Sequence, residues 1–384
     1  MIRAYTAHTS EIDDAEIAIS EILEQLEPEK NCLKNTVAVV SCYHEFATNG
    51  IVAELYKKLK CPIIGATSSL VATNQGSGQL DFAIMMITSD DVTLTAACSS
   101  SLINESEAPL SEMYNNALEG HTEKPKLILS TAPFLMNHAG DNYIDILTKS
   151  SGGIPNFGTF ALNESINYED SYVIYNDKVE HDIYSVIVAS GNINPRFLHA
   201  SISPEKILNR DAIITKSEGN LLKEVNGLPV YDYLETLGMV SNGKIRDGLL
   251  SIPLILNYTG GERPIARGLL AVNEEGYGVC GGLMSEGSKL AIGAWDKEDV
   301  VRTTLQTIEN ALSDESINAF FMYSCIVRNM VLETDIFAEA HNAGEAIADR
   351  IPYLFAYAGG EICPVGDTTY TNYFHNNTFI GCAF

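Results

Sequence analysis

Three consecutive stretches near the carboxyl end of the chain decide the fold: AFFMYSCIVRN (residues 319–329), FAEAHNAGEAIADR (337–350) and IPYLFAYAGGEI (351–362). The first and third are apolar runs of the kind that form buried strands, whereas the second has the amphipathic spacing of a helix. The first run ends in Ser before a polar loop, and Pro opens the last run, which breaks at Gly. This order predicts a strand–helix–strand unit.

The same pattern occurs twice more. One copy contains TVAVVSC (36–42), GIVAELYKKLK (50–60) and CPIIGATSS (61–69), and the other contains KLILSTAPF (126–134), NYIDILTKSSG (142–152) and IPNFGTFA (154–161). We therefore expect Ser41, Ser130 and Ser324 at equivalent carboxyl ends of strands. Ligands usually bind beside such strand ends.

Further stretches after each copy read as strand pairs: QLDFAIMMITSDDVTLTAAC (79–98), SYVIYNDKVEHDIYSVIVASG (171–191) and YTNYFHNNTFIGCAF (370–384). GLLSIPLILNY (248–258) and the apolar runs after it read as strands of a second sheet. The composition shifts over residues 204–237, and 384 residues are too many for one compact core. We predict an α/β protein with two domains of mixed β-sheet covered by helices, residues 1–203 and 204–384.

A long helix is expected over EDVVRTTLQTIENALS (298–313), with Asp296 as its amino-terminal cap. Its predicted buried stripe consists of apolar side chains at helical spacing: Val300, Val301, Leu305, Ile308 and Leu312.

Charge and composition restrict the function. The net charge of −26, from 50 acidic and 24 basic residues, would repel nucleic acid and anionic headgroups. We find no secretory leader and no apolar stretch long enough to span a membrane, and we expect a cytoplasmic protein. The 8 cysteines are scattered without CxxC spacing, which argues against disulfides and against a metal site.

The chain resembles the FIST sensory family, in which a FIST_N and a FIST_C domain adjoin. In the N-terminal part the resemblance rests on PIIGATSS (62–69), LDFAIMMI (80–87) and IPNFGTFALNES (154–165). In the C-terminal part it rests on NGLPVYDYLETLG (226–238), YSCIVRN (323–329), AYAGGEICP (356–364) and FHNNT (374–378). Ser-Cys-x-x-Arg, Gly-Glu-Ile and His-Asn, in that order, are the specific set.

The resemblance implies a sensor of bacterial signal transduction that binds a small ligand such as an amino acid. One branch of the family binds haem and senses nitric oxide. Because the similarity takes up all 384 residues, we expect a stand-alone protein that signals through a partner such as a histidine kinase, a diguanylate cyclase or a chemoreceptor.

Arg328 and Glu361 are the principal candidate ligand residues. A guanidinium binds a carboxylate through two hydrogen bonds, and a carboxylate binds an ammonium group, so the two would suit a zwitterion. Gly359 and Gly360 would let the ligand approach the main chain. The alternative is a structural ion pair, in which Arg328 binds Glu361 or Glu333.

His375 is a candidate ligand donor or axial haem ligand, and the alternative is a satisfied core histidine. Ser324, Cys325 and Asn376 complete this predicted C-terminal site. A less favoured alternative is an enzyme, a small-molecule hydrolase or transferase, with Cys325 as nucleophile and His375 as base. No stretch places a cysteine at a helix amino terminus, where its pKa would fall, so we expect no catalysis.

Thr67 and Ser68 follow the Pro-opened run of the first copy. Their hydroxyls suit polar ligand groups, and the alternative is a solvated connection.

Overall fold

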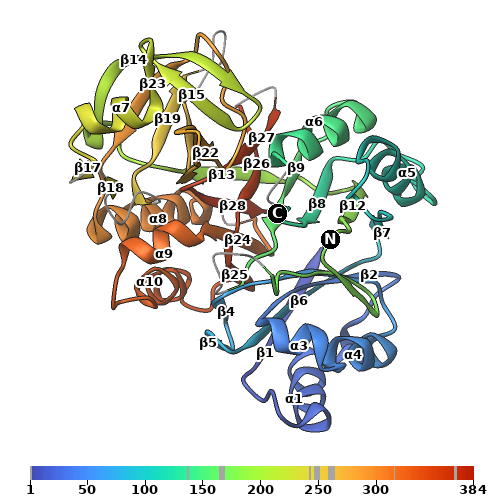
Figure 1. The fold of residues 1–384 in the computed structure, drawn as a ribbon. Coiled ribbons are helices and arrows are strands. Elements are labelled where there is room, and N and C mark those ends of the chain that lie inside the picture. The colour runs from blue at the N-terminus through green and yellow to red at the C-terminus, as the bar shows by residue number, and fades with distance from the viewer. Residues whose placement is uncertain are drawn as a thin grey trace.

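The computed structural model describes residues 2–135, 138–163, 169–241, 244–245, 251–257, 264–314, 316–366 and 370–384, with only the main chain at 209 and 210. The fold is mixed α/β, as predicted, and its sheets carry helices on their outer faces (Figure 1). No helix among these residues is both long and apolar enough to cross a membrane.

Sheet 1 has the strand order β1-β6-β2-β3-β10-β11, and only β2 and β3 pair in parallel. Its strands are β1 (Arg3–Thr9), β2 (Asn35–Cys42), β3 (Ile63–Thr67), β6 (Phe82–Ser89), β10 (Val173–Tyr175) and β11 (Lys178–Glu180). The helices packed on it are α1 (Ala15–Leu26), α3 (His44–Thr48) and α4 (Ile51–Leu59), and α2 (Pro28–Asn31) follows α1 in the chain.

Sheet 2 has the order β27-β26-β9-β8-β12-β7, and β8 and β9 are its parallel pair. Its strands are β7 (Val92–Cys98), β8 (Leu127–Ala132), β9 (Asn156–Phe160), β12 (Ser185–Gly191), β26 (Glu361–Val365) and β27 (Thr371–His375). Helices α5 (Glu107–Ala117) and α6 (Gly140–Ser151) cover it.

Sheet 3 has the order β13-β28-β24-β25-β4-β5, with β24 and β25 in parallel. Its strands are β4 (Val71–Thr73), β5 (Gly76–Gly78), β13 (Arg196–Ala200), β24 (Phe320–Cys325), β25 (Tyr353–Ala358) and β28 (Phe379–Ala383). The helices beside it are α8 (Lys297–Leu312), α9 (Ile326–Val331) and α10 (Ala338–Ile347).

Sheet 4 lies beside α8 and follows the order β20-β19-β23-β14-β15-β22-β21, with β16 on β15 (Figure 1). Its strands are β14 (Ile207–Glu218), β15 (Leu221–Val225), β16 (Leu228–Pro229), β19 (Leu254–Asn257), β20 (Ile265–Arg267), β21 (Leu269–Val272), β22 (Gly278–Cys280) and β23 (Lys289–Gly293). The 3-10 turn η1 (Pro204–Lys206) precedes it, α7 (Val230–Thr236) packs on it, and β17 (Val240–Ser241) pairs with β18 (Lys244–Ile245). In the predicted strand 248–258, residues 248–250 and 258 lie outside the described part, as do 164 and 165 of the motif 154–165.

The three predicted strand–helix–strand units are the centres of sheets 1, 2 and 3. Their inner faces meet in one core, to which alternate residues of each central strand contribute: Val37 and Val39 of β2, Leu127 and Leu129 of β8, Phe321 and Tyr323 of β24. The residue three positions after each Pro pairs across the parallel strands, as Gly65 with Val40, Gly158 with Ser130, and Phe355 with Met322. These pairings put the three units in a common register.

The predicted serines lie on these strands but at three successive positions of that register. Ser41 is one residue beyond the position of Ser130, and Ser324 is one residue beyond that of Ser41. Since successive side chains of a strand point to opposite faces, Ser41 faces the other side of its unit than Ser130 and Ser324 do in theirs. All three serines lie near the carboxyl ends of strands, as expected, with a shift of one residue from one unit to the next.

The loops after β3, β9 and β25 close on one another in a ring. Leu162 N donates to Thr67 O (2.9 Å), Gly359 N donates to Phe160 O (3.1 Å), and Tyr357 N donates to Leu70 O (3.2 Å). The carboxyl ends of the three units therefore meet.

Two of the three predicted strand pairs, 79–98 and 370–384, divide between sheets, whereas 171–191 forms the antiparallel pair β10–β11 of sheet 1 before β12 of sheet 2. β6 belongs to sheet 1 and β7 to sheet 2, while β27 belongs to sheet 2 and β28 to sheet 3. Strands from both sides of residue 203 also pair with each other, such as β9 with β26 and β13 with β28. The division at residue 203 stays a prediction.

Candidate functional site

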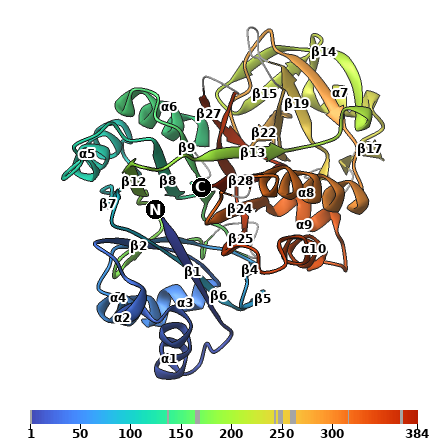
Figure 2. The same ribbon diagram turned by 180° about the vertical axis from the view of Figure 1, so that it is seen from behind.

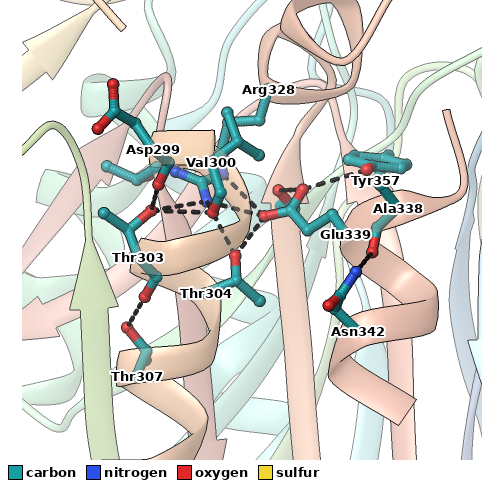
Figure 3. Close-up of polar contacts among 12 residues, drawn as sticks. Asp299, Val300, Thr303, Thr304, Thr307, Arg328, Ala338, Glu339, Asn342 and Tyr357 are labelled. Atoms are coloured by element: carbon teal, nitrogen blue, oxygen red, sulfur yellow. Dashed lines mark hydrogen bonds and ion pairs between the residues drawn. The ribbon is translucent and has the colours of Figure 1, made fainter. Parts of the chain in front are cut away.

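Arg328 lies on α9, and its main ionic partner is Glu339 of α10, which the sequence did not indicate (Figure 3). Its Nε and Nη2 atoms donate to Glu339 Oε1 at 3.0 and 2.8 Å. The Nη2 atom also donates to Val300 O at 2.9 Å and to Thr304 Oγ1 at 2.9 Å. The expected ion-pair partners, Glu361 and Glu333, were therefore wrong.

Glu339 accepts further hydrogen bonds, from three hydroxyl groups, that stabilise its buried charge. Ser324 Oγ donates to its Oε2 at 2.8 Å, Tyr357 OH donates to the same atom at 3.1 Å, and Thr304 Oγ1 donates to its Oε1. Both charged side chains are fully buried, which is tolerable only because nearly every polar atom is bonded. Ser324 thus belongs to this structural network.

The threonines of α8 explain an error in the predicted buried stripe of that helix. Its buried face includes Val300 and Ile308 but also Thr303, Thr304 and Thr307, whereas Val301, Leu305 and Leu312 are only half-buried. The face is turned toward Arg328, where hydroxyls are needed. Asp296 caps the helix as predicted, by accepting from Asp299 N at 3.0 Å.

Glu361 begins β26 and is fully buried. Thr378 Oγ1 donates to its Oε2 at 2.5 Å, whereas its Oε1 has no hydrogen-bond partner among the described residues. Burial is the largest influence and raises the pKa of this carboxyl to about 8, against hydrogen bonds from Thr378 and Cys325 that lower it. Glu361 is therefore mostly protonated near neutral pH.

Cys325 ends β24 beside Glu361 and is the residue that caps the amino end of α9, contrary to the sequence expectation. Main-chain N–H groups of Val327 and Asn377 act to lower its pKa, but burial and the Glu361 charge outweigh them and raise the pKa of the thiol well above its ordinary value. A buried thiol of this kind is a poor nucleophile.

His375 pairs with Glu361 across β27 and β26, but its ring bonds elsewhere. Its Nε2 atom lies 3.0 Å from the Cys363 carbonyl, an acceptor, so this nitrogen is a donor. Burial lowers the pKa of the imidazole to about 3. Nε2 is thus occupied by a main-chain carbonyl, as in a satisfied core histidine.

Gly359 and Gly360 were expected to let a ligand approach the main chain, but in the structure they make main-chain bonds and pack closely. Gly359 N and Gly360 O both bond to Phe160, and Gly360 does not have the positive φ that favours glycine. A Cβ atom on Gly360 would lie 2.5 Å from the Phe374 ring. Close packing therefore requires glycine here.

Thr67 and Ser68 are buried at the end of β3, so the solvated connection is excluded. Ser68 Oγ donates to Tyr357 O at 2.9 Å, and Thr67 Oγ1 accepts from Tyr172 N at 2.9 Å. Asn376 Oδ1 accepts from Gly268 N of sheet 4 at 3.4 Å. All three side chains join parts of the fold.

Asn377 is a second residue, after Glu339, that sequence reasoning missed. It lies in the turn that carries the chain from β27 to β28, has a φ of 56°, and is fully buried. Neither its Oδ1 nor its Nδ2 has a hydrogen-bond partner in the described part of the chain, and Arg328 Nη1 is in the same state. Buried amides without partners are rare. The motif FHNNT did not indicate which of its two amides would stay without a hydrogen bond.

These groups converge at the carboxyl end of β24. Cys325 N donates to Thr378 O at 2.9 Å, Asn377 N interacts with the Cys325 thiol, and both Cys325 and Arg328 act on the Glu361 carboxyl. Sheet 4 packs on this side, because a Cβ atom on Gly268 would lie 3.5 Å from Asn377 Oδ1. The arrangement offers a guanidinium N–H, an amide and a carboxyl group in a place shielded from water.

Comparison with protein families gives two adjoining matches. The FIST N domain matches residues 36–228, half of the chain, and the FIST C domain matches residues 229–364. The chain belongs to the FIST family. FIST domains are sensory domains, and this membership confirms the resemblance seen in the sequence.

Comparison with curated proteins finds no match. Among solved structures, the FIST chain is similar to cyanuric acid hydrolase from A. caulinodans, at 9% identity over 100% of this chain and 99% of that one, with a TM-score of 0.38. A likeness so distant carries no functional argument.

Proposed function

We propose that this FIST protein is a cytoplasmic sensor that binds a small polar ligand at the carboxyl end of β24 and signals through a separate partner without catalysis. Family membership supports the sensory role. All 8 cysteines are free, which fits a reducing compartment. The class of partner, whether histidine kinase, diguanylate cyclase or chemoreceptor, follows from the family resemblance alone.

The observation that carries the proposal is the set of unpartnered polar atoms on Arg328, Glu361 and Asn377. Each buried donor or acceptor without a partner costs about 1–3 kcal/mol, so these three side chains are together expensive. A ligand that carries both donors and acceptors would recover that free energy. Ordered water could also bond to these atoms. A ligand would then displace that water and bond to the same atoms.

The charges favour an amino acid or a similar zwitterion. Glu339 already balances Arg328, but Nη1 still offers a charged donor to a carboxylate. A ligand ammonium group would bind the ionised form of Glu361, which is the minor form below a pKa of about 8. Binding should therefore release a proton, and affinity should rise by up to about tenfold per pH unit until the pH reaches that pKa.

The test is a thermal-shift screen of the purified protein against amino acids, purines, short-chain acids and haem, followed by calorimetry of each hit. A ligand specific for the folded state adds about 2.7 kcal/mol at 100 times its Kd. Asn377→Gly is the decisive variant, because glycine accepts the left-handed backbone and removes only the amide. Asn226→Gly is its control, since Asn226 has a similar φ of 53° in the turn between β15 and β16.

We expect Asn377→Gly to weaken binding by about 1–3 kcal/mol, with its stability retained, and Asn226→Gly to leave affinity unchanged. A ligand whose affinity ignores Asn377→Gly would refute the site. A Soret band in the purified protein, or a Cys325 that reacts rapidly with thiol reagents, would instead support the haem sensor or the enzyme.

A further inference from the structure

A group of lysines surrounds a cleft at the opposite ends of the sheet 1 strands, where β2 and β3 begin. The cleft has a volume of about 560 Å³, and its lining includes Lys34 before β2 and Lys58 and Lys60 at the end of α4. A second hollow of about 690 Å³ shares Lys58 and Lys60 and adds Lys30 and Lys57. Figure 2 shows α2 and α4, which form its walls, side by side at the edge of the molecule. We call the two adjoining hollows together the lysine cleft.

This concentration of positive charge is unusual for the chain. Five of its 24 basic residues lie here, although acidic residues number 50 and the net charge is −26. Lys30 and Lys57 are paired with Glu27 and Glu54 on their own segments. Lys34, Lys58 and Lys60 have no ion pair within the part of the chain that the structure describes, and Glu29 is the acidic side chain in the lining of the first hollow.

Helix stability explains only part of the group. Lysines in the last turn of a helix interact favourably with the helix dipole, and Lys57 and Lys58 occupy that turn of α4. Lys34 lies on a different segment, and Lys60 follows the helix end in a left-handed conformation with a φ of 55°. The stability of α4 therefore does not account for the charges that Lys34 and Lys60 bring to the cleft.

We infer that the lysine cleft binds a small molecule with two or more negative charges, of the phosphate or polycarboxylate class. The volume is in the range of small-ligand sites. The three exposed ammonium groups come from two sides of the cleft, so one multivalent anion can contact several of them at once. The inference is independent of the sensory site, which lies at the carboxyl ends of the strands.

The experiment titrates the full-length protein with pyrophosphate and, separately, with citrate, by calorimetry at constant ionic strength. The test variant is Lys34→Gln/Lys58→Gln/Lys60→Gln. Its control is Lys124→Gln/Lys244→Gln/Lys289→Gln, which removes the same charge from exposed positions elsewhere. Circular dichroism and thermal melts establish that both variants are folded, and Lys34→Gln alone is measured in case the triple variant is not.

We expect saturable binding of at least one anion, weakened about tenfold or more in the test variant and unchanged in the control. Binding of pyrophosphate alone would identify a phosphate ligand, and binding of citrate alone a carboxylate ligand. No saturable binding of either anion, or an equal loss in both variants, would overturn the inference. A test variant that changes only the oligomeric state would also overturn it, because the lysines would then serve a protein contact.

Discussion

Glu361 couples the stability of the protein to pH. Its pKa is about 8 in the folded state against an ordinary value of 4.5, so the folded protein holds a proton that the unfolded chain releases between these values. The free energy of unfolding should therefore fall as pH rises through this window, by up to about 1.4 kcal/mol per unit, and level off above it. Glu361→Gln imitates the protonated form and should lack this dependence.

Urea unfolding of both proteins from pH 5 to pH 9 measures the difference, in which all other titrating groups cancel. The advantage of Glu361→Gln over the unsubstituted protein should grow with pH. Parallel curves would mean that water or a ligand keeps the carboxylate ionised.

For single residues, the sequence predicted which side chains lie together better than it predicted their hydrogen-bond partners. Arg328, Cys325 and Glu361 do lie together, because β24 of sheet 3 ends where β26 of sheet 2 begins. Glu339 was not found, since a single glutamate in an amphipathic helix looks like any exposed one, and only three-dimensional packing buries it. For the same reason the bond from His375 to a carbonyl was beyond prediction.

Among elements, the Arg328–Glu339 pair holds three helices against sheet 3. It joins α9 to α10, and the bonds to Val300 O and Thr304 bring in α8. Arg328→Met and Glu339→Gln should each destabilise the fold by about 3–5 kcal/mol, because each leaves a buried charge without its partner. The double variant should lose less than the sum of the two.

Denaturant melts of the four proteins in this cycle give the coupling free energy. Exact additivity would show that the two side chains are stabilised separately, by the threonines and by Tyr357. Arg328→Lys serves as the comparison that keeps the charge but not the planar geometry.

The strand–helix–strand units were predictable because local signals define them: apolar runs for the strands, 3.6-residue spacing for the helices, and Pro at each second strand. The connections between these units were not predictable. A short turn such as residues 376–378 looks the same in sequence whether it folds a hairpin or leads into another sheet. The predicted strand pairs therefore gave no sign of which sheet each strand would join, although each strand was in its place.

In the whole molecule, Asp141 fastens sheet 4 to the rest of the fold. The Oδ1 atom of this α6 residue lies 2.7 Å from Nη2 of the buried Arg267, and its Oδ2 accepts from Leu283 N at 2.8 Å. Arg267 Nη1 donates to Phe374 O at 2.6 Å, next to the turn that carries Asn377. Sheet 4, which covers the unbonded amide of Asn377, is therefore held down by a carboxylate from the other half of the chain.

Asp141→Asn keeps the size of this side chain but removes the charge that Arg267 faces, and it should loosen sheet 4. Hydrogen exchange of residues 264–293 should become faster by about tenfold or more, while β2 and β8 keep their protection. Asp145→Asn, on the exposed side of the same helix, is the matched control. Should ligands enter beneath sheet 4, Asp141→Asn should also speed their association without strengthening the contacts in the bound state. Uniformly faster exchange through all four sheets would contradict this view, since it would show that Asp141 stabilises the fold as a whole and not the attachment of one sheet.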